Sequence, residues 1–521
     1  MTRTHSKILV QSSPGMAPTF CNRCGDAAEE GCDPWDELTE LDALLERLKL
    51  KRYDLKRKIN RFHSPVVRQL PPDVTSTIFE FCLPDFTGPP LLAFTKENLS
   101  FPLSLGAICS YWRDIAWSTP SLWSSLVVRV TSKHDPHIIA GVAQEWLARS
   151  GQLPLSIRIL ARNVQTVPAL ADITNRYSTR WSDLDLCMPP DFYQHFCAID
   201  NHAPTLKSIR FHSSPDMSSN FKLTCPRLER ASLAYFPMDK SDIQLDNLTH
   251  LTLHSMSTID SFLILRKTPR LVFCKVSGTN IEYRRQNIGA PVLTSLRCLH
   301  LLIGFAEDFL NNIIAPHLEV LSLPNYYNPS MEVVSSFLRR SACKLRSFSV
   351  IFSISPPYFE GFMSLLQSMP SLDSLLLRSI TKTLETTTPE DYDPQNIFQL
   401  LAKVLSSQSS SQQEFLPNLR ILEYKGELYL RPGNYNDLYS SLPTNNAVRG
   451  RLRLFKLDLF PASRIPTNMI FYLSSFAERG ITVNVKSHSE DILRSSIDYY
   501  RSRGKNLLRD WTDNLDPSLF S

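Results

Sequence analysis

The residue types that most often carry out chemistry are sparse in this sequence. Cys21 and Cys24 are separated by two residues and Cys32 follows, which is half of a zinc-ligand pattern. A structural zinc site needs four ligands, and no second closely spaced pair follows. The pattern favours reduced thiols in a flexible tail over the alternative of zinc binding. We therefore expect neither a metal nor a cofactor.

An acid–base group would need residue types such as those of His488, Glu490 and Asp491. Because these residues lie near a predicted helix start, we interpret them as a surface cluster. The sequence contains no His-Glu-x-x-His and no Gly-x-Ser-x-Gly motif, and Gly504-Lys505 lacks the preceding glycine of a phosphate loop. Glycine is also scarce, at 16 of 521 residues. We expect that this protein is not an enzyme.

Composition bounds the class of protein. With 521 residues, 43% of them hydrophobic, the chain can form more than one domain with a sizeable core. A net charge of +5 is too weak to favour nucleic-acid binding. No apolar run is long enough for a membrane span, and Ile8-Leu9-Val10 is too short for a signal peptide. Scattered cysteines favour a reducing compartment, so we expect a cytoplasmic or nuclear location, or both.

The stretch over residues 70–123 predicts a small helical module. Leu70-Pro71-Pro72-Asp73 is a helix start, because proline has a helix-ready φ and aspartate suits the positive first turn. Val74, Ile78, Phe79 and Cys82 follow at helical spacing. A second helix is predicted with one apolar face, formed by Leu105, Ile108, Cys109, Trp112 and Ile115. So short a unit cannot bury so many large apolar residues itself, and a partner must cover the rest.

These residues resemble the F-box domain in the form common in fungal F-box proteins. The matching elements are Leu70-Pro71-Pro72, the pairs Ile78-Phe79, Ile108-Cys109 and Trp112-Arg113, and the close from Pro120 to Trp123. The link over residues 84–102 is longer than usual. The resemblance implies docking on a Skp-family linker subunit, and through it on a cullin. The residues it implies for the linker contact are Leu70, Pro71, Ile78, Phe79, Ile108, Cys109, Trp112, Ile115, Leu122 and Trp123. Ile78, Ile108 and Trp112 could equally belong to the module's own core.

Residues 35–62 predict a helix of about four heptads. Its seam consists of Leu38, Leu41, Leu45, Leu48, Arg52, Leu55, Ile59 and Phe62. Acidic residues lie at its start and basic residues at its end, which suits the helix macrodipole. It could form a homodimeric coiled coil, pack on its own chain or remain solvated.

An internal repeat covers much of the remaining chain. The pattern apolar-x-x-apolar-x-apolar occurs eleven times, from Trp181/Leu184/Leu186 to Leu454/Leu457/Leu459. From Trp181 to Leu372 the first positions are 20 to 27 residues apart, within the leucine-rich-repeat range. Each unit predicts a short parallel strand and a return segment. The units lack the usual asparagine and resemble the degenerate leucine-rich repeats of F-box proteins, which implies an irregular horseshoe.

Strand alternation places the residues between the apolar positions on the outward face. In the early repeats the outward residues predict a mildly basic stripe, which could bind an acidic or phosphorylated protein segment. The alternative is ordinary solvated surface. The candidate substrate-binding residues are Arg210, Arg230, His250, Lys275 and His300.

The predicted organisation begins with a disordered tail (1–34), an amphipathic helix (35–63) and an F-box-like module (64–130). An α/β solenoid of leucine-rich-repeat type (131–487, with a loop insertion at 379–415) and a C-terminal cap (488–521) complete it. By resemblance, the chain is a substrate adaptor of a Skp–cullin–F-box E3 ubiquitin ligase, with an unknown protein substrate. Two alternatives remain: a scaffold that binds the linker without recruiting a cullin, and a leucine-rich-repeat interaction protein in which residues 70–123 only cap the solenoid.

Overall fold

The computed structural model describes residues 34–63, 69–84, 96–130, 135–161, 167–196, 199–212, 221–236, 241–278, 290–302, 306–323, 329–352, 356–379, 395–406, 415–426, 451–459, 464–487 and 490–503. Among these, the residues up to Leu122 form one compact unit, unit 1, and those from Trp123 onward form a second, unit 2. The tail over residues 1–33, with its three cysteines, lies outside the described residues. So do His488, residues 504–521 and parts of the predicted loops at 84–102 and 379–415.

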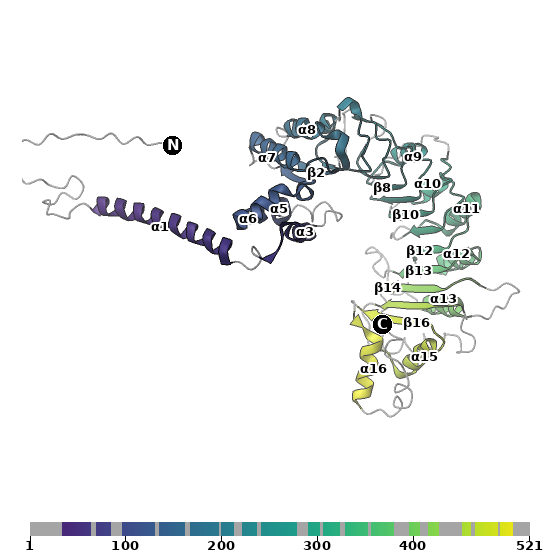
Figure 1. The fold of residues 1–521 in the computed structure, drawn as a ribbon. Coiled ribbons are helices and arrows are strands. Elements are labelled where there is room, and N and C mark those ends of the chain that lie inside the picture. Colours follow the sequence, from purple (N-terminus) through teal and green to yellow (C-terminus); the bar gives the residue numbers. More distant parts are fainter. Residues whose placement is uncertain are drawn as a thin grey trace, which may run out of the picture. The chain divides into compact units, whose positions relative to one another are not determined.

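Unit 1 is helical (Figure 1). Its helices are α1 (Pro34–His63), α3 (Pro72–Phe81), α5 (Lys96–Ile108) and α6 (Ser110–Ser118), and a 3₁₀ turn η1 (Pro120–Trp123) leads into unit 2. Helix α3 begins as predicted, with Pro71 at its N-cap, proline at the first helical position and Asp73 in the first turn. The long helix α1 confirms the helix predicted over residues 35–62.

The predicted second helix is wrong in one respect, because the chain breaks it at Cys109. That residue has φ −156° and ψ 166°, which is extended backbone, and its Sγ accepts a hydrogen bond from the Trp112 amide at 3.4 Å. Cys109 is therefore the N-cap of α6. Ile108 and Trp112 lie on different helices, so they cannot share one helical face. The second helix also begins earlier than predicted, within the link over residues 84–102, since α5 starts at Lys96 and contains Pro102.

The core of unit 1 lies where α3 and α5 pack on α6. Phe79 and Trp112 meet edge to face, with ring centroids 5.0 Å apart. Gly106 is required where α5 crosses α6, since a Cβ at this position would collide with the Trp117 ring. The Tyr111 hydroxyl donates to the Leu70 carbonyl oxygen at 3.2 Å, which fixes the segment before α3 to α6.

Unit 2 is a mixed α/β structure built on a 15-stranded sheet. Strands follow one another in chain order and pair in parallel, except for the antiparallel pair β16–β17. The strands are β1 (Ser125–Val130), β2 (Leu155–Ala161), β3 (Trp181–Cys187), β4 (Ser208–His212), β6 (Arg230–Ala234), β8 (His250–His254), β9 (Phe273–Ser277), β10 (Cys298–Leu302), β11 (Val320–Leu323), β12 (Ser347–Phe352), β13 (Ser374–Ser379), β14 (Ile421–Gly426), β15 (Leu454–Leu459), β16 (Thr482–Ser487) and β17 (Glu490–Asp491). A separate two-stranded sheet joins β5 (Phe221–Leu223) and β7 (Ser241–Ile243).

Helices and 3₁₀ turns form the connections. They are α7 (Pro136–Arg149), α8 (Val167–Asn175), η2 (Ser178–Arg180), η3 (Pro190–His195), η4 (Ile199–Asn201), α9 (Thr258–Arg266), α10 (Ala306–Asn311), α11 (Met331–Ser341), α12 (Pro356–Gln367), α13 (Gln395–Leu405), α15 (Thr467–Glu478) and α16 (Ile492–Ser502). Figure 1 shows α9 to α12 stacked along one side of the strands. The apolar core of unit 2 lies between these helices and the inward side chains of the sheet.

A recurring turn precedes most strands. The amide of the first apolar residue donates to the carbonyl three residues earlier, as at Leu206, Leu248 and Leu372. The three apolar side chains of the pattern are then buried, and strand pairing aligns them from repeat to repeat, for example Leu299 with Leu321. The predicted parallel strands are confirmed. Among the described residues, neighbouring repeats and helices cover each apolar face.

The boundaries of the sheet differ from the prediction. Residues 125–130 were predicted to belong to the helical module, but they form the edge strand β1, paired with β2. In the last repeat the buried set is Leu452, Phe455 and Leu457 rather than the predicted set that begins at Leu454, because Leu454 pairs with the outward Ile421. The slip of two residues places Leu454 on the outward face but keeps Leu457 inward and Lys456 outward, since strand side chains alternate with period two.

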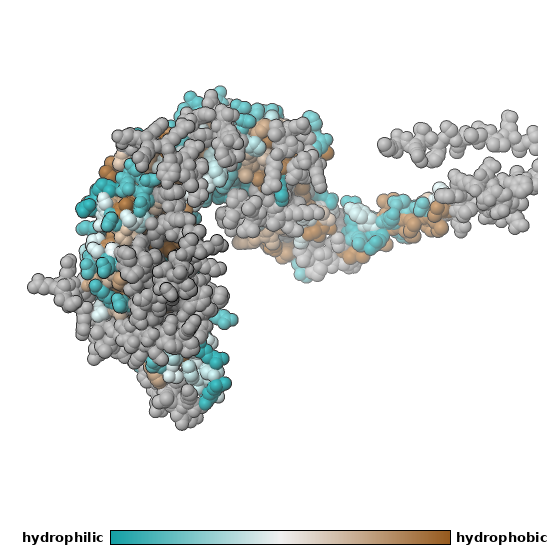
Figure 2. All heavy atoms as spheres, turned by 180° about the vertical axis from the view of Figure 1, so that it is seen from behind, coloured by the Kyte–Doolittle hydropathy of each residue, from teal (hydrophilic) through white to brown (hydrophobic). Residues whose placement is uncertain are grey.

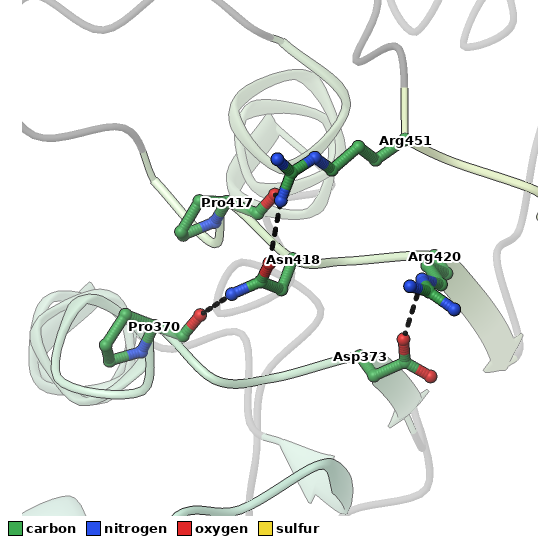
Figure 3. Close-up of polar contacts among 6 residues, drawn as sticks. All are labelled: Pro370, Asp373, Pro417, Asn418, Arg420 and Arg451. Carbon is green, nitrogen blue, oxygen red and sulfur yellow. Dashed lines mark hydrogen bonds and ion pairs between the residues drawn. The ribbon is translucent and has the colours of Figure 1, made fainter.

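Side chains tie successive repeats together at the turn. Asn418 donates to the Pro370 carbonyl at 3.0 Å and accepts from Arg451 at 2.8 Å (Figure 3). Asn247 makes the same bridge between the Pro226 carbonyl, at 2.7 Å, and Arg270, at 2.9 Å. Both asparagines directly precede the buried leucine of their repeat, so this position links a repeat to the one before it.

Candidate functional site

Some of the residues predicted for the linker contact are buried and others are exposed. Phe79, Ile115, Leu122 and Trp123 are buried. Leu70, Cys109 and Trp112 are half-buried, whereas Pro71, Ile78 and Ile108 are exposed. The sequence could not separate these groups, because helical spacing identifies apolar faces without showing which face a neighbouring helix covers.

Helix α3 carries an apolar stripe on its surface. Val74, Ile78 and Phe81 are exposed by 40%, 43% and 87%, and their spacing of four and then three residues places them on one side of the helix. Phe81 was not among the predicted residues, although its spacing from Val74 and Ile78 could have identified it. On α5, Ile108 is also exposed, by 55%. We refer to Val74, Ile78 and Phe81 as the α3 stripe.

Trp123 belongs to unit 2 and has no surface to offer a partner. It is completely buried, meets Trp146 edge to face at 4.9 Å, and has the Arg149 guanidinium 4.9 Å from its ring centroid. The Trp146 ring N–H donates to the Ser125 carbonyl at 3.1 Å. Trp123 therefore anchors the first helix of unit 2 to its edge strand.

The five candidate substrate-binding residues lie on the outward face of the large sheet, the strand face. Strand pairing places Arg210, Ser232, Thr252, Lys275 and His300 in one row across β4 to β10. A neighbouring row on the same strands contains Arg230, His250 and Phe273. The fold thus brings all five predicted residues into two adjacent rows.

Two aspartates on β3 compensate much of the positive charge of the predicted basic stripe, and the sequence analysis did not include them in it. The Asp185 carboxylate accepts from the Arg158 Nε at 2.8 Å and from an Arg210 terminal nitrogen at 3.0 Å. Asp183 lies 3.9 Å from Arg230. Burial raises the pKa of Asp185 in spite of the two guanidinium groups, and burial also lowers the pKa of Arg158. Lys275 has no carboxylate within 4.0 Å among the described residues.

Aromatic and imidazole rings lie on the strand of Lys275 and on other strands of the same face. Phe273 lies between His250 and His300, at centroid distances of 5.8 and 5.4 Å. His212 stacks on His254 at 6.2 Å, and the His254 Nδ1 lies 2.6 Å from the Ser277 hydroxyl. Burial is the largest cause that lowers the pKa of His212, His254 and His300. The centre of the strand face therefore offers stacking surfaces and hydrogen-bonding groups around one ammonium.

The described part of the chain brings metal-ligating residue types together in small groups, such as Cys298 Sγ and His300 Nε2 at 3.1 Å. No group of three or more His, Cys, Asp or Glu side chains that could hold a metal ion occurs there. Burial raises the pKa of the Cys225 and Cys274 thiols to about 12, so both are protonated core residues with little thiolate character. The cysteines of the predicted half zinc pattern lie outside the described residues.

Comparison with known proteins yields no relative, since no family model matches the chain and no curated protein matches it. Among the helices that the structure describes, none has the length and apolarity that crossing a membrane requires.

Proposed function

We propose that this protein is the substrate-recognition adaptor of a Skp–cullin–F-box E3 ubiquitin ligase, with a non-catalytic role. Unit 1 would act as an F-box-like module that docks on a Skp-family linker subunit. Unit 2 would act as an irregular leucine-rich-repeat solenoid that holds a protein substrate. The sequence resemblance over residues 70–123 motivates the first part, and the recurring turn and parallel strand motivate the second.

The observation that carries the proposal is the α3 stripe. A short helix that places three large apolar side chains on its surface gains little from folding alone, because their apolar area stays in water. A partner with an apolar groove could bind such a row, with the three side chains as the anchors of the helix. The exposed Ile108 on α5 would extend the contact. The buried Phe79 would support the stripe from beneath rather than touch the partner.

The decisive experiment substitutes the stripe without touching the core. In the full chain, Val74→Glu with Ile78→Glu should weaken binding to a purified Skp-family linker by about a hundredfold or more, because each apolar anchor contributes about 1.5 kcal/mol or more when covered. Calorimetry measures the affinity. Ser76→Glu is the matched control, because Ser76 lies on the same helix about 160° away from Val74, and this variant should leave binding unchanged.

Each outcome has a consequence. Equal binding by the stripe variant and the control, or no binding by the unaltered chain, would refute linker docking through α3. Circular dichroism shows whether the helices survive the substitutions. A cullin pulldown with the assembled pair then separates a ligase adaptor from a scaffold that binds the linker alone.

The strand face is the proposed substrate surface. Since Arg210 and Arg230 already face aspartates, Lys275 with its flanking rings is the part of the predicted stripe best able to receive an acidic group. An extended segment lying across the rows could stack on Phe273 and place one carboxylate or phosphate at Lys275. Capture of substrates by the unaltered chain but not by Lys275→Glu would support this assignment.

A further inference from the structure

Helix α1 has an apolar seam that nothing covers in the described part of the chain. Every residue from 38 to 59 is exposed, and Leu41, Leu45, Leu48 and Leu55 each leave about half of their side-chain surface in water. Figure 2 shows apolar residues of this helix uncovered beside polar ones. Apolar positions that alternate in steps of three and four residues are the spacing of a coiled-coil seam. The helix therefore fits another helix of similar length.

Charge along α1 is strongly divided between its two halves. Residues 38–48 contain three acidic side chains and one basic, whereas residues 49–59 contain six basic and one acidic. Within the helix, Glu46 pairs with Lys49 at 2.7 Å and Asp54 with Lys58 at 2.9 Å. The basic half nevertheless contains more basic side chains than these two acidic residues can pair with. A second helix that fits must bring acidic residues to the basic half.

We propose that α1 pairs in antiparallel orientation with α1 of a second copy of this chain. Only an antiparallel pair places the acidic half of each copy along the basic half of the other. A parallel pair would align like charges along its whole length and would stack Arg52 on Arg52 in the seam. The proposal does not depend on the proposed ligase function.

The seam fixes the register of the pair. Aligning residue 50 with residue 50 of the second copy sets Leu41 level with Ile59, Leu45 with Leu55, and Leu48 with Arg52. Every seam position from 41 to 59 then meets a seam position, and the long stem of Arg52 covers Leu48 while its charge reaches water. Beside the seam, Asp42 flanks Lys56 of the second copy. Lys49 and Lys51 each approach their own counterparts near the two-fold axis, on opposite sides of the seam, and these like-charge contacts limit the affinity.

Sedimentation equilibrium of the full chain tests the pairing, with a dimer expected at micromolar concentrations. Leu45→Glu should weaken the dimer at least tenfold, because it places a carboxylate against Leu55 of the second copy in the seam. Leu50→Glu is the matched control, because Leu50 is also an exposed leucine of α1, at 69%, but lies outside the seam. Circular dichroism verifies that α1 stays helical. A monomer throughout, or equal effects of the two variants, would overturn the proposal.

Charge exchange tests the orientation. In an antiparallel pair, Asp42→Lys and Lys56→Asp should each weaken the dimer severalfold, and combining them should restore it. In a parallel pair Lys56 would flank Lys51 of the second copy, so Lys56→Asp alone would strengthen the dimer. A stronger Lys56→Asp dimer, or a double variant no better than the single ones, would refute the antiparallel arrangement.

Discussion

At the scale of single residues, Asp185 is the polar centre of unit 2. Its carboxylate is buried between Arg158 on β2 and Arg210 on β4, so one side chain joins three strands. Taking the Arg158 and Asp185 charges out of water costs free energy, and the mutual attraction offsets that cost only while the partners are present. The buried charge on Arg158 is the part of the group most dependent on Asp185.

We predict that Asp185→Ala destabilises the first strands of the sheet by about 3 kcal/mol, because it removes the carboxylate from a buried guanidinium. Hydrogen exchange of β2, β3 and β4 should then be about a hundredfold faster. The matched control is Asp242→Ala, because the Asp242 side chain is 73% exposed and its carboxylate lies 3.8 Å from Lys222. That exposed pair should contribute little to stability. Equal exchange rates in both variants would contradict the assigned role of Asp185.

At the scale of elements, unit 2 is held by interactions that each connect one repeat to the next. Strand pairing and the recurring turn supply most of them, and the asparagine bridges at Asn247 and Asn418 supply two more. Each bridge satisfies a carbonyl of the preceding repeat and an arginine of the following one. Such nearest-neighbour links make stability local to the strands that they join.

We predict that Asn418→Ala lowers the stability of β13 to β15 by about 1 kcal/mol, because two hydrogen bonds of an exposed side chain are lost. Asn247→Ala should have the same effect on β6 to β9. Each variant serves as the control for the other in a hydrogen-exchange experiment. A uniform increase in hydrogen exchange across the whole sheet in either variant would contradict the prediction that each bridge stabilises only the strands near it.

At the scale of the whole molecule, stability should depend on pH through the histidines of the strand face. Burial lowers the pKa of His212, His254 and His300 below the usual value of 6.5, so the folded protein binds fewer protons than the unfolded chain in that window. Stability is therefore full above about pH 6.5 and falls as the pH decreases toward the folded pKa values. Asp185, whose pKa is raised, acts with the opposite sign at lower pH.

We predict that the melting temperature of the full chain decreases between about pH 7.5 and about pH 5.5, the window in which histidine titrates. The variant His212→Asn with His254→Asn should show a shallower decrease, whatever its stability at neutral pH. Parallel pH profiles of the two proteins, measured by calorimetry, would exclude these histidines as the source.

The sequence by itself determined the elements whose signal is local. The period-two pattern located the repeat strands, and even the two-residue slip at Leu454 left Lys456 on the correct face. Heptad spacing located α1, and the proline pair located the start of α3. The five candidate residues of the strand face followed from the same alternation, because parallel pairing keeps equivalent positions in register.

Tertiary structure alone decided which of these surfaces are covered and which charges meet. Spacing cannot show that Phe79 is buried while Phe81 is exposed, because the difference depends on α6, some thirty residues away in the chain. Nor can it show that Asp185 neutralises Arg158 and Arg210, which come from separate strands. Periodicity records the geometry of one element, whereas burial and ion pairing arise only when distant elements come into contact.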